Sequence, residues 1–380
     1  MPKTSVIAKP HYPILDGLRG VAALMVVVFH LFEAHATSHL DQIINHGYLA
    51  VDFFFLLSGF VIGYAYDDRW NQMTIGSFVK RRLVRLQPMV VVGMIIGAVC
   101  FYFQASDLWP TIAQTPVWLM LLVMVLGCFM IPVPLSLDLR GWGETYPLNG
   151  PGWSLFFEYV VNILYAVAIR KFPTWALALL VVLSAGALLH LGLTSPQGDV
   201  IGGWSLNQTQ LRIGFCRVMY PFFAGLLLFR VARLAHIKNA FFWCSLLVIT
   251  VLAMPRVGGS EHLWMNGLYD SLSIIFVFPL IIFLGASGEI RSSFAQKLCR
   301  FLGDISFPIY ITHYPLIYLY TAWVQDNKVP LPQAYPYAIL IFLSAVAYVC
   351  LTFYDEPVRL WLKKQVLLQN VEKLEKIFLP

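Results

Sequence analysis

Long apolar runs, interrupted only by isolated polar residues, recur along almost the whole chain. An α-helix needs about 20 such residues to cross the hydrocarbon core of a bilayer, so runs of this kind indicate helices surrounded by lipid or by other helices. The pattern therefore predicts an all-α, polytopic membrane bundle. The runs cover residues 14–34, 48–66, 86–104, 115–132, 152–169, 173–192, 212–229, 239–254, 270–286, 303–323 and 334–353.

Lysine and arginine are concentrated in a subset of the polar segments between these runs. Lysine and arginine occur in 69–85, 170–171, 230–238, 291–300 and the tail after 355. The segments 36–47, 105–114 and 193–211 contain neither residue. The positive-inside rule places the basic segments, and with them both termini, in the cytoplasm. Two cytoplasmic termini require an even number of crossings, but there are eleven runs. We therefore expect ten transmembrane helices, with 115–132 re-entrant or lying along the interface.

Composition supports a membrane location. Hydrophobic residues make up 59% of the chain and charged residues only 12%, about half the charged share of a soluble domain. The net charge of +6 is explained by the basic loops, so nucleic acid is not an expected partner. Six scattered cysteines form no CxxC or Cys/His cluster, which predicts neither disulfides nor a metal site. No polar stretch is long enough for a second domain, and we expect one domain over residues 1–380 with no fused soluble domain.

The first apolar run carries the most informative polar residues. Arg19 and His30 are eleven residues apart, about three helical turns plus 20°, so they share one helix face about 16.5 Å apart. Ionisable residues inside membrane segments are functional candidates. The structural alternative is that Asp16 pairs with Arg19 and that His30 packs inside the bundle.

Further candidates lie in later runs. Glu158 either follows a helix start capped by Ser154 or orients a histidine base such as His30. Asp52 is expected to pair with an arginine, and the partners of Arg212 and Arg217 are left open. In the run 303–323 the spacing of Ser306, Tyr310 and His313 places them on one helix face, with His313 in a supporting or a catalytic role. The cluster of Arg81, Arg82 and Arg85 suits phosphate groups or, alternatively, anionic lipid.

Six ordered motifs resemble one family. They are the segment Leu15-Asp-Gly-Leu-Arg-Gly-Val-Ala-Ala leading to His30, the segment Gly47 to Ile62, Lys80-Arg-Arg-Leu-Val-Arg-Leu-Gln-Pro88, Trp153-Ser-Leu-Phe-Phe-Glu158, Ser306-Phe-Pro-Ile-Tyr-Ile-Thr-His313-Tyr-Pro315 and Glu356-Pro357 with Arg359. Together they resemble the acyltransferase-3 family of integral membrane acyltransferases. The matches span residues 15 to 359, although Phe307-Pro308 departs from the pair that many relatives carry.

The resemblance implies a membrane O-acyltransferase, in most cases an O-acetyltransferase. The donor would be acetyl-CoA or another acyl-CoA in the cytoplasm, with no metal. The acceptor would be a hydroxyl of an extracytoplasmic carbohydrate or glycolipid. A bacterial inner membrane is the expected location, with membrane lipid around the bundle. Some relatives carry a fused extracytoplasmic esterase-like domain, so either transfer is direct here or a separate extracytoplasmic partner completes it.

Each candidate residue receives a role in this scheme. A hydroxyl nucleophile needs a general base, and His30 either fills that role or carries the acyl group transiently. Arg19 and the cluster of Arg81, Arg82 and Arg85 would bind the donor. Glu158 and His313 complete the predicted catalytic set. Aromatic and amide residues in 193–211 and 256–270 suit a sugar or, alternatively, an interfacial aromatic belt.

Two other functions fit the same bundle. A polytopic transporter also has buried charges and a polar path, and a glycan exporter or scaffold would lack acyl-transfer chemistry altogether. No inverted repeat is visible in the sequence, which weighs mildly against transport. Turnover of labelled acyl-CoA separates the enzyme from both.

Overall fold

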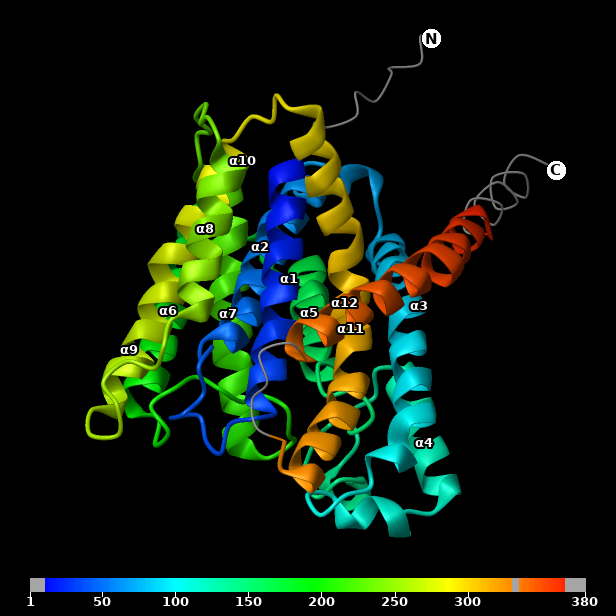
Figure 1. Cartoon of the computed structure of the whole chain (residues 1–380). Helices are drawn as coiled ribbons and strands as arrows, with labels where there is room; N and C mark the ends of the chain where they lie inside the picture. The colour runs from blue at the N-terminus through cyan, green and yellow to red at the C-terminus, as the bar shows by residue number, and fades with distance from the viewer. Residues whose placement is uncertain (1–10, 330–334, 366–380) are drawn as a thin grey trace, which may run out of the picture.

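The computed structural model describes residues 11–329 and 335–365, and helices account for most of this part of the chain (Figure 1). No strand is present among these residues. The α-helices are α1 (Pro13–Glu33), α2 (Ala50–Tyr66), α3 (Ile75–Cys100), α4 (Val117–Cys128), α5 (Gly152–Val167), α6 (Thr174–Thr194), α7 (Gln208–Val231), α8 (Ala240–Ala253), α9 (Leu263–Leu272), α10 (Phe278–Ala286), α11 (Ser293–Asn327) and α12 (Tyr335–Cys350).

The predicted all-α membrane bundle is confirmed, because each of the eleven apolar runs is helical. The ninth run covers the end of α9 and all of α10, which a π-helical turn at Ser273–Val277 joins into one helix. A second π-turn, Leu351–Asp355, continues α12, so that the last described helix covers Tyr335–Gln365. The chain is an integral membrane protein.

Helix length separates the helices that can cross a bilayer from those that cannot. Within the described residues, eight are long and apolar enough to span it. The 35-residue α11 is also long enough but carries more polar residues, and the 14-residue α8 reaches about 21 Å. With 12 residues α4 reaches only about 18 Å, against a hydrocarbon core of about 30 Å. It packs beside the second half of α3, where Gly127 faces Met94 (Figure 1).

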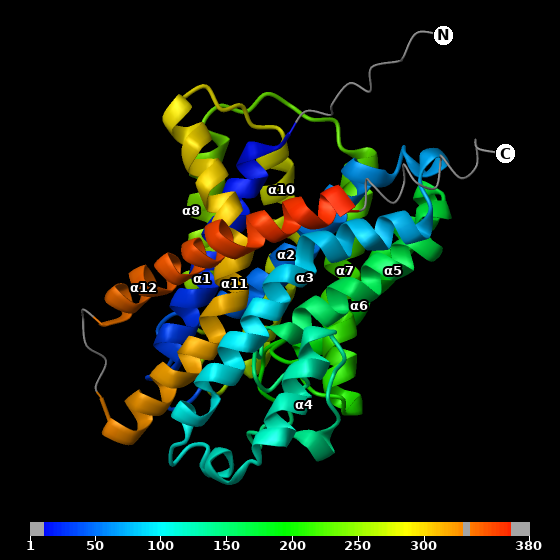
Figure 2. The ribbon, with the colours of Figure 1, turned by 90° about the vertical axis from the view of Figure 1, so that its right-hand side faces the viewer.

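Two close helix contacts hold the bundle together. The helices α1 and α11 run in the same direction side by side (Figures 1 and 2). A Cβ atom on Gly20 would lie 2.3 Å from the carbonyl oxygen of Leu302, and one on Gly303 would lie 2.6 Å from Cβ of Asp16. Without water to drive helices together, small residues that allow such close approach are a main source of stability in membranes.

The second contact joins α2 to α7. A Cβ atom on Gly59 would lie 2.1 Å from the Phe222 carbonyl oxygen, and one on Gly225 would lie 2.0 Å from that of Leu56. Near the start of α2, the carboxylate of Asp52 accepts hydrogen bonds from Nη2 and Nε of Arg217 at 2.6 and 3.2 Å. This pair confirms the expected arginine partner of Asp52, and it identifies the partner of Arg217.

The short length of α4 generates a topological prediction. Single cysteines introduced at Thr115 and Pro134, which flank α4, should react with a membrane-impermeant thiol reagent from the same side. Accessibility mapping in intact cells or spheroplasts, in a variant lacking the six native cysteines, measures this. Cysteines at Asp68 and Asp107, which flank α3, should label from opposite sides and serve as the control for a true crossing. Opposite labelling of positions 115 and 134 would show that α4 crosses the membrane.

Candidate active site

Two cavities enter the bundle from opposite ends. The first, of about 320 Å³, lies between the first halves of α1, α3, α5 and α11, most of the length of α2 and the C-terminal helix after α12. The second, of about 430 Å³, lies at the other end, between α1, the start of α2, the start of α5 and the loops around Trp142 and Trp204. The residues that line the first cavity include nine charged side chains, whereas the second is dominated by aromatic rings.

Arg19 lines the first cavity and ties α1 to α11. Its Nε donates a hydrogen bond to Oγ of Ser306 at 2.8 Å, and its Nη2 donates to the carbonyl of Gly303 at 3.0 Å. The carboxylate of Asp16, one turn earlier, lies 3.3 Å from Nη2, so the sequence-based pairing of these two residues is confirmed. These contacts fix the guanidinium at the cavity wall, and its remaining N–H groups are left for a ligand.

The other basic residues of the first cavity differ in their partners. Arg82 donates to Oε1 of Glu158 at 2.5 Å, and Glu158 also accepts from the hydroxyl of Ser58 at 3.0 Å. Arg85, one turn further along α3, lines the same cavity and has no hydrogen-bond or ion-pair partner among the residues that the structure describes. Arg85 therefore presents to the cavity a guanidinium group that no hydrogen bond or ion pair from the described residues occupies.

Arg81 differs from these two arginines, although the sequence groups all three. Its side chain, which is exposed like that of Arg85, does not line the cavity. Around the helix Arg81 lies about 100° from Arg82 but only about 40° from Arg85, so its difference from Arg85 is one of position along the axis, since Arg85 lies one turn further along α3. We therefore remove Arg81 from the candidate site.

His30 lines the second cavity and has a carboxylate partner on its own helix. Nδ1 of His30 lies 2.7 Å from Oε2 of Glu33, one turn away. A carboxylate accepts only, so Nδ1 carries a proton, and in a neutral imidazole Nε2 then keeps a free lone pair. Both side chains are partly exposed to the cavity, at 17% for His30 and 36% for Glu33. This arrangement matches a histidine base held in one tautomer by a carboxylate.

Glu158 does not occupy the position that the sequence-based hypothesis assigned to it. It lies at the first cavity against Arg82, and the carboxylate that holds His30 is that of Glu33. The alternative cap is also wrong, because Ser154 donates to the Pro151 carbonyl and caps no backbone N–H. The i,i+3 spacing of His30 and Glu33 was a visible signal of their pairing.

His313 lies beside His30 but is buried behind it. The two ring centroids are 5.6 Å apart, and α11 carries His313 on the same face as Ser306 and Tyr310, as the spacing predicts. Nδ1 of His313 donates to the Tyr310 carbonyl at 2.8 Å, while its buried Nε2 has no partner in the described part of the chain. This geometry favours a supporting role, because His313 is not among the residues that line the second cavity.

The second cavity has an aromatic wall and a second carboxyl group. Trp142, Trp153, Trp204 and Tyr314 line it together with Glu144. Oε1 of Glu144 accepts a hydrogen bond from the hydroxyl of Tyr318 at 2.6 Å. Burial raises the pKa of Glu144 to about 7, and the Arg140 guanidinium, 3.5 Å from Oε2, opposes this only in part.

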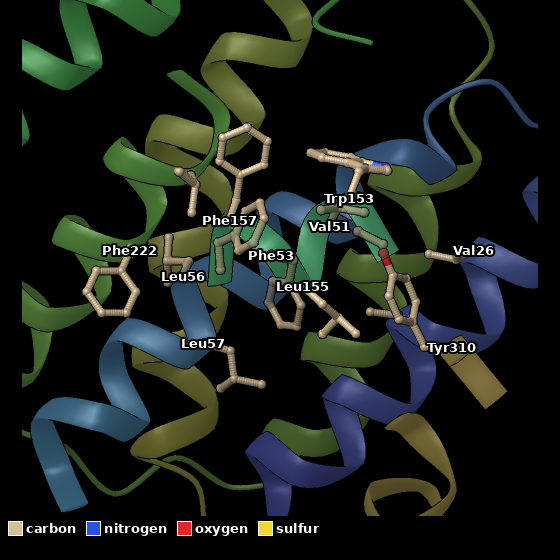
Figure 3. Close-up of a cluster of buried hydrophobic side chains, with 14 of the residues drawn as sticks. Val26, Val51, Phe53, Leu56, Leu57, Trp153, Leu155, Phe157, Phe222 and Tyr310 are labelled. Atoms are coloured by element: carbon tan, nitrogen blue, oxygen red, sulfur yellow. The ribbon is translucent and has the colours of Figure 1, made fainter. Parts of the chain in front are cut away.

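The two cavities meet at Val51 and Tyr310, the residues that line both. In Figure 3 the hydroxyl of Tyr310 points towards Val51. The hydroxyl of Ser154 donates its hydrogen bond to the carbonyl oxygen of Pro151. The Tyr310 hydroxyl is therefore the donor in its 2.7 Å hydrogen bond with Oγ of Ser154. Thus one valine and one tyrosine border both the arginine-lined cavity and the cavity that contains His30.

Within residues 11–329 and 335–365, no group of three or more His, Cys, Asp or Glu side chains is suited to hold a metal ion. The chemistry that these residues offer is acid–base chemistry at His30 and anion binding at Arg19 and Arg85.

Comparison with known proteins identifies the family. The family model of the acyltransferase domain matches residues 12–355. The chain belongs to the acyltransferase-3 family. This membrane acyltransferase is therefore an enzyme, and the family match includes both cavities except for His11 and Arg359 at the edge of the first.

Relatives of this acyltransferase include proteins named as O-acetyltransferases. It is 24% identical to O-acetyltransferase OatA of Staphylococcus aureus (strain NCTC 8325 / PS 47) and 22% identical to peptidoglycan O-acetyltransferase OatA of Listeria monocytogenes, over 92% and 94% of this chain. The chain spans only 58% and 57% of those two proteins. Protein 2 in the picA locus of Rhizobium radiobacter is 37% identical over 40% of this chain and 80% of its own length. No solved structure shows a significant match.

The buried carboxyl group of Glu144 makes stability depend on pH. The pKa of Glu144 lies near 7 in the folded protein and near its ordinary value of 4.5 in the unfolded chain. Between these two pH values the folded protein therefore keeps a proton that the unfolded chain loses. The contribution of Glu144 to stability therefore falls as pH rises from about 4.5 to 7 and stays constant above that. Melting temperatures of the detergent-solubilised protein at pH 5, 6, 7 and 8 should show this loss in the wild type and a smaller one in Glu144→Gln. The exposed Glu261→Gln should behave like wild type, and equal pH profiles for all three proteins would contradict the prediction.

Proposed function

We propose that this acyltransferase is an O-acyltransferase, in the first instance an O-acetyltransferase, that moves an acyl group from cytoplasmic acyl-CoA to a hydroxyl of an extracytoplasmic glycan or glycoside. The observation that carries the proposal is the meeting of two cavities of different chemistry at Val51 and Tyr310. One has unpaired positive charge, and the other has a histidine base held by a carboxylate.

The first cavity suits acyl-CoA. Guanidinium groups bind phosphate through charge-assisted hydrogen bonds, and Arg85 has no other partner among the described residues. Deeper in the cavity the wall is apolar, with Val51, Phe54 and Leu57, which suits an acyl chain and a pantetheine arm. The positive-inside rule supports a cytoplasmic location for this arginine-rich end, in a bacterial inner membrane, and acyl-CoA is made in the cytoplasm.

The second cavity suits a sugar hydroxyl. Aromatic rings stack on the apolar faces of sugars, and carboxylates accept hydrogen bonds from sugar hydroxyls. Trp153, Trp204 and Glu144 supply these groups next to His30. The relatives named O-acetyltransferase support acetyl as the acyl group, and the one named for peptidoglycan makes peptidoglycan fragments the first acceptor to test.

In the proposed reaction, Nε2 of His30 removes the proton from the acceptor hydroxyl as its oxygen attacks the thioester carbonyl carbon. A C–O bond forms, the C–S bond breaks, and CoA leaves as a thiolate that takes up the proton from the imidazolium. Glu33 stabilises the imidazolium through its bond to Nδ1. The acyl group reaches His30 past Val51 and Tyr310, and His313 packs behind the base.

The His30 variant tests the enzyme function directly. Purified protein in proteoliposomes should transfer label from acetyl-CoA, supplied on the arginine-rich side, to peptidoglycan fragments. His30→Ala should lower this rate by about 10²–10⁴-fold, the usual contribution of a general base, while acyl-CoA binding persists. His236→Ala, at an exposed histidine far from both cavities, is the control. Wild-type turnover by His30→Ala would refute the assignment, and labelled solute crossing the membrane without thioester cleavage would favour a transporter.

The donor site makes a separate prediction. Arg19→Ala and Arg85→Ala should each raise KM for acetyl-CoA about tenfold or more, because a hydrogen bond to a charged group contributes about 1.5–3 kcal/mol. Arg81→Ala, on the same helix but outside the cavity, should leave KM nearly unchanged. If Arg81→Ala and Arg85→Ala raise KM equally, the effect belongs to the general charge of this surface and not to the cavity.

A further inference from the structure

We infer that Val51 and Tyr310 select the acyl group by size, so that acetyl passes between the cavities and longer acyl groups are rejected. This inference rests on the proposed function and extends it to the specificity of the donor. Its basis is that these two side chains line both cavities and therefore stand where a thioester carbonyl must pass to meet the hydroxyl activated by His30.

Tyr310 forms a fixed wall of this passage. Its hydroxyl is bound to Oγ of Ser154, which is itself bound to the Pro151 carbonyl. One side of its ring is covered by the edge of Phe54, with centroids 5.5 Å apart and planes at 82°. Tyr310 lies in the middle of α11 and is only 6% exposed. A ring held at its hydroxyl and against a second ring does not swing aside to admit a larger group.

Val51 is the other residue that lines both cavities, and in this inference its shape sets the width of the passage. It sits in the first turn of α2, only 7% exposed, and the next residue, Asp52, is anchored by Arg217. A β-branched side chain in a helix has one strongly preferred rotamer, so its two methyl groups stay in place. The Asp52 pair holds the backbone of this turn. We therefore expect side-chain volume to set the width of the passage, so that removing methyl groups should widen it.

The size of the effect follows from hydrophobic selectivity. One methylene group in an apolar pocket changes discrimination between substrates by about 10–200-fold. Replacing valine by alanine removes two methyl groups from the wall, so propionyl-CoA and butyryl-CoA should gain relative to acetyl-CoA. Val51→Ile adds a methylene group and should have the opposite effect. The chain provides a matched control in Val61, which lies on the same helix and lines only the first cavity.

The experiment compares kcat/KM for acetyl-, propionyl- and butyryl-CoA in wild type, Val51→Ala, Val51→Ile and Val61→Ala. CoA release is followed with a thiol reagent in the presence of peptidoglycan fragments and, separately, with water as acceptor. The ratio of propionyl to acetyl kcat/KM should rise at least tenfold in Val51→Ala, fall in Val51→Ile, and stay within about twofold of wild type in Val61→Ala. Because the readout is a ratio within each variant, it does not depend on the fraction of folded protein.

Two failures can be told apart. If wild type releases no CoA from any donor with either acceptor, the proposed function fails. If wild type is active and the ratio is unchanged in the Val51 variants, the inference on acyl size is overturned while the proposed function stands. Should Val51→Ala fail to fold, an unchanged ratio in Val51→Ile has the same meaning.

Discussion

The bundle depends on the pairing of charges inside a structure that lipid surrounds. A charge left alone there costs several kcal/mol, so each buried ion must meet a partner, and the partner must come from a helix placed at the right depth. Asp52 and Arg217 fix α2 against α7, and Arg82 and Glu158 fix α3 against α5. Because these charges are paired, an arginine without a partner among the described residues, such as Arg85, supports the proposed binding of an anionic ligand in its cavity.

Much of the fold follows from the sequence because membrane helices can be recognised from the length and apolarity of their segments. All eleven runs are helical, and the parity of the basic loops singled out 115–132, the run that forms the short α4. The helix contacts were less predictable. Gly20 and Gly303 are unremarkable in sequence, and their closeness appears only when α1 and α11 lie side by side. Such contacts depend on two surfaces fitting together, and one sequence contains no record of that fit.

The candidate site was predictable where residues share one helix. The faces holding Arg19 with His30, and Ser306 with His313, follow from the helical period alone. Contacts between helices were not predictable in this way, and Glu158 was assigned to His30 although it belongs with Arg82. The pairing of Glu33 with His30 needed only an i,i+3 spacing, yet a carboxylate at a helix end is as easily interpreted as an exposed residue. The sequence identified the chemical groups, and the structure was needed to distribute them between two cavities.

The contact between α1 and α11 also has a consequence for biosynthesis. Arg19 and Ser306 touch each other although 287 residues separate them in the chain. At about 5–20 residues per second, a ribosome needs roughly 14–57 s to travel that distance. Throughout that interval α1 is already in the membrane without the helix that completes both cavities. A nascent chain thus lacks the α11 side of both cavities until that helix has been inserted.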